Sequence, residues 1–390
     1  MAGDGGGVQQ PFAAAVARAL RPRLLAERDR IEAGRRLTDD LTRELAGQGF
    51  FRMFLPAAYG GLDLAPTQGL TVLEELARAD ASVAWCVWNG NTHWIVAQLS
   101  AEGMRAVHAK ADVVTANSTR ASGVAEAVDG GFRVNGRWSL VSGCELSAWM
   151  VLLCVVHNGG KPRLTSSGAP ETRFVVVPAS ACKIIDTWTV SGLRGTGSHD
   201  VTVHDAFVPA RHTAGFTDAY VLTKPRYRMP PFCRVIPGLG AMALGIARTA
   251  IASLTELAAD KQLQRSQQIL RENHGAQLRV SEAEALVRSA RLYLFDSVDR
   301  LWRTLLDTGT APIEMRADAR MAAWHAVFSA AKAVDLMHAA AGASALYTSS
   351  PLERAFRDVH AISQHIGVHS RVMESAGRVL FGLEPDTPLL

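Results

Sequence analysis

The hydrophobic pattern of this chain changes its period twice along its 390 residues, and this limits the folds it can adopt. Apolar residues recur at three- and four-residue spacing through residues 12–111, which predicts an N-terminal helical domain. Between residues 112 and 215 the spacing moves towards two, with β-rich runs such as 151–156 and 174–177, which predicts a central β domain. Residues 235–382 return to a helical spacing. We therefore expect an α+β fold in which a β domain separates two helical ones.

The C-terminal segment is rich in alanine and is interrupted by turn-forming residues at three places. These places lie near residues 273–275, 308–310 and 347–351. They divide the segment into about four or five helices, which predicts an antiparallel bundle.

Composition excludes several classes of protein. The formal net charge of +4 is small and dispersed, so nucleic acid is not an expected partner. The five cysteines are widely spaced, which indicates reduced thiols and no metal site. No apolar run approaches the roughly 20 residues of a membrane helix, and the N-terminus lacks a signal-peptide pattern. We expect a cytoplasmic protein with no membrane span.

Two segments of the β domain combine small residues with hydroxyl side chains. Residues 136–143 read Gly-Arg-Trp-Ser-Leu-Val-Ser-Gly, and residues 192–198 read Gly-Leu-Arg-Gly-Thr-Gly-Ser. Taken alone, they could be a Ser-Gly turn and a Gly-rich hairpin. Small residues also let a backbone approach a planar ring, and hydroxyls can bond to its polar edge. Neither segment is a Rossmann or P-loop motif, so the chain shows no nicotinamide site.

The segment 357–367 reads Arg-Asp-Val-His-Ala-Ile-Ser-Gln-His-Ile-Gly. It resembles the R-D-x-x-x-x-x-x-(Y)-E-G-T segment of acyl-CoA dehydrogenases. The loop 54–63 and the helix end 74–82 resemble that family's V-P-x-x-Y-G-G and E-E-L-x-x-x-D-x-S segments, and the resemblance covers nearly the whole chain. It implies the acyl-CoA dehydrogenase fold: an N-terminal helical domain, a central β domain and a C-terminal helical bundle. It also implies a homotetramer, or a dimer of the same type, formed through the bundle.

The dehydrogenases use a glutamate where this chain has Ile366, and isoleucine cannot accept a proton. The family's other glutamate position falls near Val235, again without a carboxylate. The residue before Ile366 is His365, which can exchange protons near neutral pH. This combination resembles the flavin-dependent monooxygenases of the same fold, the oxygenase components of two-component aromatic hydroxylases.

That resemblance implies a reaction, a cofactor and a partner. Reduced FMN or FADH2, delivered by diffusion from a separate flavin reductase, would react with oxygen to give a C4a-hydroperoxyflavin. This species would hydroxylate an aromatic or polycyclic small molecule. The family's dinucleotide-binding glycines are partly replaced at residues 342–346, which is compatible with loosely bound flavin such as FMN.

The resemblance also assigns roles to residues. His365 would deprotonate or orient a phenolic hydroxyl, and Ser142 would support the flavin edge. His93 is a weaker catalytic candidate, because a lone histidine on a tryptophan-flanked helix is as readily a core residue. Trp188 is a candidate pocket wall, as is Trp138, although a structural role is at least as readily assigned to either. The cofactor-binding candidates are Trp138, Ser142, Gly143, Arg194, Thr196 and Ser198.

Two alternatives remain open from the sequence. One is an acyl-CoA dehydrogenase-like flavin dehydrogenase with a non-standard base and tightly bound FAD. The other is a non-catalytic paralogue that only binds a ligand, and flavin uptake would separate it from both enzymes.

Overall fold

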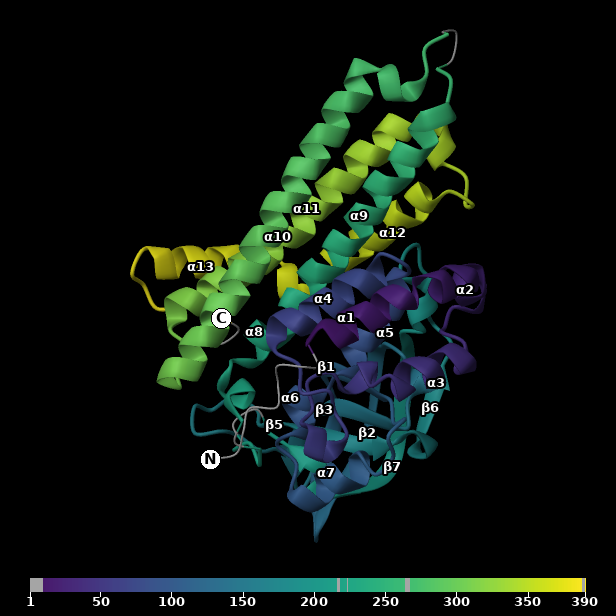
Figure 1. Cartoon of the computed structure of the whole chain (residues 1–390). Coiled ribbons are helices and arrows are strands. Elements are labelled where there is room, and N and C mark those ends of the chain that lie inside the picture. Colours follow the sequence, from purple (N-terminus) through teal and green to yellow (C-terminus); the bar gives the residue numbers. More distant parts are fainter. Residues whose placement is uncertain (1–9, 216–217, 223, 264–266, 388–389) are drawn as a thin grey trace.

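Helices, strands and again helices follow one another along the chain, which confirms the α+β class and its expected order. The computed structural model describes residues 10–215, 218–222, 224–263, 267–387 and 390. Figure 1 shows a sheet at one end of the molecule and a long helical bundle at the other, with N-terminal helices between them.

The N-terminal block supplies the layer between sheet and bundle. Its α5 begins where the Asp80 carboxylate accepts a hydrogen bond from the Val83 N–H at 3.0 Å, an N-cap that fixes the start of the helix. The helices are α1 (Gln10–Ala19), α2 (Arg21–Gly34), α3 (Asp39–Gly47), α4 (Pro66–Ala77), α5 (Ala81–Gly90), α6 (His93–Val96) and α7 (Ala101–Val107).

The central block forms one mixed sheet. Its order is β6-β7-β2-β1-β3-β5-β8, with β4 paired to β3. β1 and β3 run parallel, whereas the other described pairs are antiparallel. The strands are β1 (Thr115–Val128), β2 (Gly131–Val141), β3 (Trp149–Asn158), β4 (Lys161–Pro162), β5 (Thr172–Pro178), β6 (Cys182–Ile185), β7 (His199–Pro209) and β8 (Thr213–Ala214).

Strand β1 leaves its ladder with β3 for part of its length. Ser118 pairs with Leu152, and the next pair is Gly123 with Cys154, so four residues of β1 lie opposite a single residue of β3. Pairing of β1 with β2 also begins only at Gly123. Residues 119–122 therefore form a bulge outside both ladders, and all four are exposed.

Trp138 occupies the space beside this bulge, in the core of the sheet. Its indole N–H donates to the Leu153 carbonyl at 2.7 Å, and its side chain is fully buried. A Cβ on Gly123 would lie 2.0 Å from the Trp138 ring, so glycine is required where β1 crosses the indole. The expectation that Trp138 forms a pocket wall is therefore corrected, because its strand face points into the sheet core.

The C-terminal block is a bundle whose helix ends lie at the predicted breaks. Asn273 caps the start of α10, Gly309 ends it in the left-handed conformation, and Pro351 begins α12. The helices are α8 (Pro231–Val235), α9 (Pro237–Asp260), α10 (His274–Thr308), α11 (Ile313–Ala341), α12 (Pro351–Ser363) and α13 (Arg371–Leu380).

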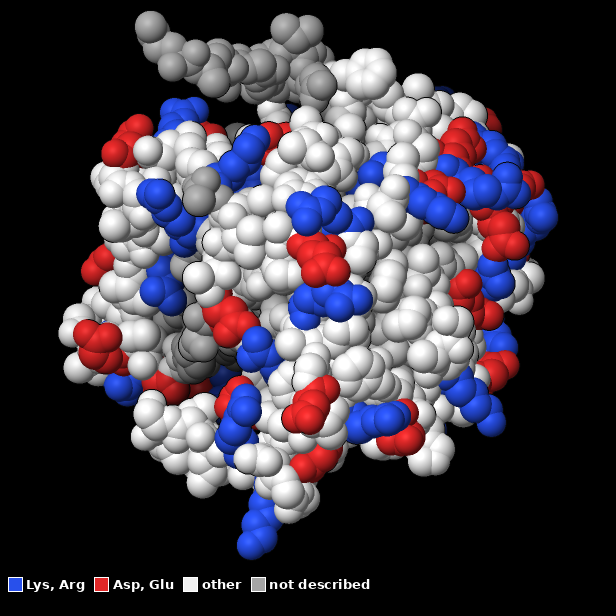
Figure 2. All heavy atoms as spheres, turned by 90° about the horizontal axis from the view of Figure 1, so that it is seen from below, with Lys and Arg blue, Asp and Glu red and all other residues white. Residues whose placement is uncertain are grey.

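One described helical stretch, Pro231–Asp260, is apolar enough by composition to cross a membrane, with a mean hydropathy of 1.6. Of the 18-residue window of this stretch to which that hydropathy belongs, 78% is buried inside the molecule, as expected for a core helix. On the face shown in Figure 2, positive and negative side chains are interspersed. Exposed pairs of the sheet include Arg137 with Asp200 at 2.8 Å and Arg163 with Glu171 at 2.6 Å.

Candidate active site

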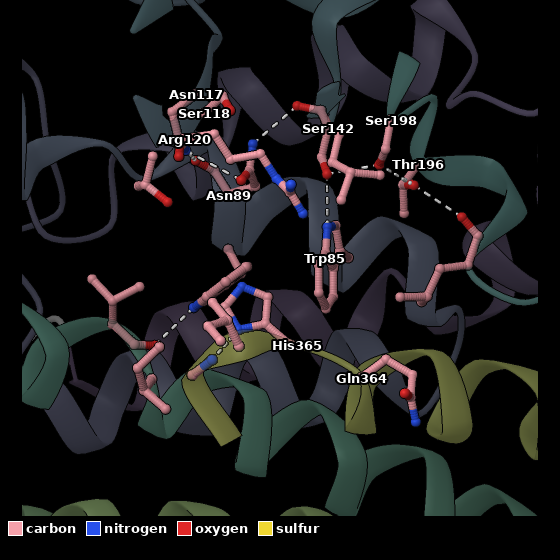
Figure 3. Close-up of a pocket in the computed structure, with 18 of the residues that line it drawn as sticks. Trp85, Asn89, Asn117, Ser118, Arg120, Ser142, Thr196, Ser198, Gln364 and His365 are labelled. Carbon is pink, nitrogen blue, oxygen red and sulfur yellow. Dashed lines mark hydrogen bonds between the residues drawn. The ribbon is translucent and has the colours of Figure 1, made fainter. Parts of the chain in front are cut away.

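A cavity of about 750 Å³ lies where the sheet, α5 and the bundle meet. The sheet contributes residues from β1 and β2, and α5 contributes two tryptophans. The bundle contributes residues of α8, the end of α12 and the turn that follows α12. Figure 3 shows several of the lining side chains, among them Trp85, Asn89, Arg120, Ser142, Ser198 and His365.

Three buried hydroxyls form a hydrogen-bonded chain along one wall (Figure 3). The Oγ atoms of Ser142 and Ser198 lie 2.7 Å apart, and Ser198 Oγ lies 2.7 Å from Thr196 Oγ1. The Trp85 indole donates to Ser142 at 2.9 Å, and Thr196 donates to the Leu193 carbonyl at 2.9 Å. An indole can only donate and a carbonyl can only accept, so both ends of the chain are fixed. Each hydroxyl then donates to the next, from Ser142 towards Leu193.

The backbone around Ser142 is held by its neighbours. The Gly143 N–H donates to the Thr196 carbonyl at 2.8 Å, which joins the two hydroxyl-bearing segments. Gly143 has a φ of 71°, a conformation that glycine adopts without strain. The Asn89 side chain donates to the Ser142 carbonyl at 2.9 Å. Gly143 therefore shapes the site through its backbone.

His365 faces the cavity from the bundle side. Its ring meets the Trp88 and Trp85 rings edge-on, with centroids 5.5 Å and 5.8 Å away. The Gly367 N–H donates to Nδ1 at 3.0 Å. Burial, with a smaller effect from the Arg320 charge, lowers the pKa of His365 to about 4. The ring is therefore neutral at pH 7, and because Nδ1 accepts a hydrogen bond, its proton is on Nε2.

Arg320 is a buried cation behind the His365 turn. Its guanidinium donates to the Gly367 carbonyl at 3.0 Å and to the Phe232 carbonyl at 3.4 Å. No carboxylate within the described ranges pairs with it, and its side chain is 1% exposed. Burial lowers the pKa of Arg320 to about 10, so it stays charged at neutral pH. It ties the turn η11 (Ile366–Val368) to α8 and adds positive potential beside the cavity.

Of the remaining residues predicted from the sequence, some line the cavity and others do not. Trp188 lines the cavity, and its indole donates to the Leu193 carbonyl at 3.2 Å. Arg194 is exposed, lies outside the cavity lining and pairs with Glu32 of α2 at 3.3 Å, so its role in cofactor binding stays a prediction. The side chain of His93 lies outside the described part of the chain.

Sequence reasoning missed part of the site. Trp85, Trp88 and Asn89 follow one another at i, i+3 and i+4 on α5, a spacing that places them on one helix face. That spacing was a usable signal. Asn117 and Arg120 also line the cavity, but nothing local distinguishes them, because strand pairing places Asn117 in the ladder with β3 and Arg120 in the exposed bulge. Among the described residues, no group of His, Cys, Asp and Glu could hold a metal ion.

Comparison with known proteins gives a consistent result. Residues 8–110 match the N-terminal domain of acyl-CoA dehydrogenase, and residues 237–370 match its C-terminal domain. The chain is 30% identical over 364 residues to an indole-3-acetate monooxygenase of Pseudomonas putida, covering 92% of each. It is 30% identical over 360 residues to the oxygenase subunit HsaA of a flavin-dependent monooxygenase from Rhodococcus jostii, covering 89% of this chain and 92% of that one. The crystal structure of a 3-HSA hydroxylase from Rhodococcus matches with a TM-score of 0.87 and 28% identity, over 98% of this chain and 100% of that chain.

Proposed function

This chain belongs to the flavin-dependent monooxygenases built on the acyl-CoA dehydrogenase fold, and from that membership we propose that it hydroxylates an aromatic small molecule. One observation carries the proposal: three hydroxyls and a neutral histidine face a single cavity, and the described residues that line it include neither Asp nor Glu. A dehydrogenase that removes a proton beside a thioester needs a base there. A buried hydroxyl chain and a neutral imidazole instead suit binding of a flavin and a phenol.

The residues of the cavity fit a flavin. Its volume of about 750 Å³ suits a cofactor, and tryptophans and hydroxyls line it together. Reduced FMN or FADH2, when bound, supplies the electrons and the ring on which oxygen is activated. The Ser142 hydroxyl donates its proton to Ser198 and accepts one hydrogen bond from Trp85. One lone pair of its oxygen therefore stays free to accept from an N–H on the flavin edge. Thr196 and Ser198 hold Ser142 in this orientation.

His365 orients the substrate in this proposal. Its Nε2 has no hydrogen-bond partner within the described ranges, and it carries the proton because Nδ1 accepts from Gly367. Of the two roles that the resemblance implies, the tautomer therefore favours donation to a phenolic oxygen over removal of its proton. Such a donor stabilises negative charge on that oxygen, and the buried Arg320 charge acts in the same sense.

Part of the cavity wall is apolar, which would limit the access of water to the reacting atoms. Trp85 and Trp88 form one side, and Phe232, Ile236 and Ile366 form another. An apolar enclosure strengthens each hydrogen bond to the ligand and slows side reactions with solvent. His93 remains a candidate for substrate contact.

We also propose a flavin reductase as partner, a homotetramer or related dimer as the assembly, and a cytoplasmic location. The Rhodococcus jostii relative is named as an oxygenase subunit, which supports a separate flavin reductase as partner. Because this reductase would have to supply reduced flavin to the oxygenase, the two proteins would share a compartment, which supports the cytoplasmic location. Exposed apolar side chains on and after the bundle helices support the assembly: Phe328, Leu346, Tyr347, Phe356, Leu380 and Phe381. Light scattering on the purified protein measures the assembly directly.

The function is tested by turnover under isotopically labelled oxygen gas. The protein is mixed with a flavin reductase, NADH and either FMN or FAD, together with a panel of phenols. We expect a hydroxylated product that carries the label. If every phenol gives only hydrogen peroxide, the proposal is wrong, and bleaching of bound FAD by an acyl-CoA would identify a dehydrogenase.

A further inference from the structure

One charged side chain enters the cavity. Arg120 is the single Arg, Lys, Asp or Glu among the described residues that line it. No hydrogen bond or ion pair to another described residue involves its guanidinium. Figure 3 shows its side chain extending from β1 into the cavity. A cation that faces a cavity without a partner among the described residues is suited to a ligand of opposite charge.

The fold places this residue by means of the β1 bulge. Residues 119–122 lie outside the ladders with β2 and β3, so Arg120 is free of the alternation that would set its side chain on one sheet face. The β3 residue opposite the bulge is Leu153, and its carbonyl accepts a hydrogen bond from the Trp138 indole at 2.7 Å. The position of Arg120 therefore depends on strand pairing in this part of the sheet.

Arg120 differs from other arginines of the same sheet. Arg137 pairs with Asp200 at 2.8 Å, and Arg173 pairs with Asp218 at 2.7 Å. No equivalent carboxylate is offered to Arg120 by the described residues. The other arginine close to this cavity, Arg320, has no carboxylate partner there either. Neither positive charge is therefore neutralised by a carboxylate of the described residues.

We propose that Arg120 binds an anionic group of the organic substrate, so that the preferred substrate is an aromatic compound carrying a carboxylate. This proposal rests on the proposed function and names its substrate class. A guanidinium binds a carboxylate through two parallel N–H donors, which fixes orientation as well as affinity. Arg120 enters from the sheet side and His365 from the bundle side, so the anion and the reacting ring occupy opposite parts of the cavity.

Binding of matched ligand pairs tests the proposal without turnover. The probes are benzoate, phenylacetate and 3-phenylpropionate, each compared with its uncharged primary amide, and binding is followed by calorimetry. The proteins are wild type, Arg120→Met and Arg120→Lys. As a control for loss of a sheet arginine, we use Arg137→Met, which lies outside the cavity and pairs with Asp200.

We expect the wild type to bind at least one carboxylate roughly 10- to 100-fold more tightly than its amide, as for a charge-assisted hydrogen-bonded pair. Arg120→Met should lose that preference with little change in amide binding, whereas Arg137→Met should keep it and Arg120→Lys should keep part of it. If no carboxylate binds better than its amide in the wild type, or if Arg120→Met keeps the preference, the proposal is wrong.

Two further outcomes separate this proposal from related ones. If Arg120→Met weakens binding of reduced FMN but not of reduced riboflavin, the residue binds the flavin phosphate and the substrate assignment is overturned. A carboxylate preference that depends on Arg120, without labelled product from any phenol or aromatic acid, would refute the oxygenase function and leave the anion site intact. Labelled product from neutral phenols, together with a carboxylate preference that Arg120→Met leaves unchanged, would support the oxygenase function and refute the anion site.

Discussion

The backbone N–H of Leu193 donates to a carboxylate oxygen of Asp358 at 2.7 Å, although the two residues are 165 positions apart. Leu193 has a φ of 52°, a left-handed conformation that is uncommon for a branched residue. Its carbonyl accepts hydrogen bonds from Thr196 and Trp188. A buried carboxylate on α12 therefore holds the loop that carries the end of the hydroxyl chain.

Removal of this carboxylate should destabilise the protein. Asp358→Ala leaves the buried Leu193 N–H without its acceptor, which should lower the free energy of unfolding by about 1–3 kcal/mol. Asp358→Asn keeps an acceptor oxygen and should cost less. Urea titration followed by circular dichroism measures both variants. Equal losses would show that the negative charge, and not the acceptor, matters.

The same residue should give stability a specific pH dependence. Burial raises the pKa of Asp358 to about 7, offset in part by the Leu193 N–H, while Asp80 and Glu32 raise it further and Arg357 lowers it. The folded state thus favours the protonated acid, so its stabilising contribution is present below about pH 4 and is lost as pH rises to about 7. Asp358→Asn lacks this loss. We expect its stability relative to wild type to increase between about pH 4 and pH 7 and then to stay constant, as measured by denaturant titration.

The His365 imidazole should stay neutral across the range of most assays. Its pKa is lowered to about 4, so a histidine-dependent limb of the pH–rate profile should lie near that value and not near 6.5. Arg320→Met removes one of the two causes and should raise the pKa of His365, whereas Arg320→Lys keeps the charge and should not. Nuclear magnetic resonance titration of the His365 ring measures this shift. Identical titration curves in the two variants would contradict the assigned electrostatic effect.

Loss of the Ser142 hydroxyl should uncouple flavin oxidation from product formation. Ser142→Ala removes the acceptor of the Trp85 indole and the first donor of the hydroxyl chain. We expect more hydrogen peroxide per NADH consumed, with product yield reduced about 10-fold or more. Ser118→Ala is the matched control, because Ser118 lines the same cavity but bonds instead to the Ser139 carbonyl at 3.4 Å. An equal effect of both substitutions would mean that the chain has no special role.

Local sequence patterns predicted a large part of the fold. The hydrophobic period gave the three blocks, and the ends of α10 and the start of α12 follow from Asn273, Gly309 and Pro351. The replacement of a glutamate by Ile366 beside His365 identified a changed chemistry. That change and the role of Ser142, which stays a prediction, came from the family resemblance. The blocks and helix ends are readable because helix caps, turns and periodicity depend on neighbours along the chain.

The tertiary structure decided which side chains meet. Trp138 turned into the sheet core and Arg194 turned to Glu32, because the direction of each side chain depends on strand register and on contacts with α2. Strand register also produced the bulge that exposes Arg120, and burial beside Trp85 and Trp88 of α5 lowered the pKa of His365. The sequence by itself determined the order of helices and strands and the residue types available for chemistry. Only long-range pairing, which no local pattern encodes, determined the wall of the cavity and the protonation of its groups.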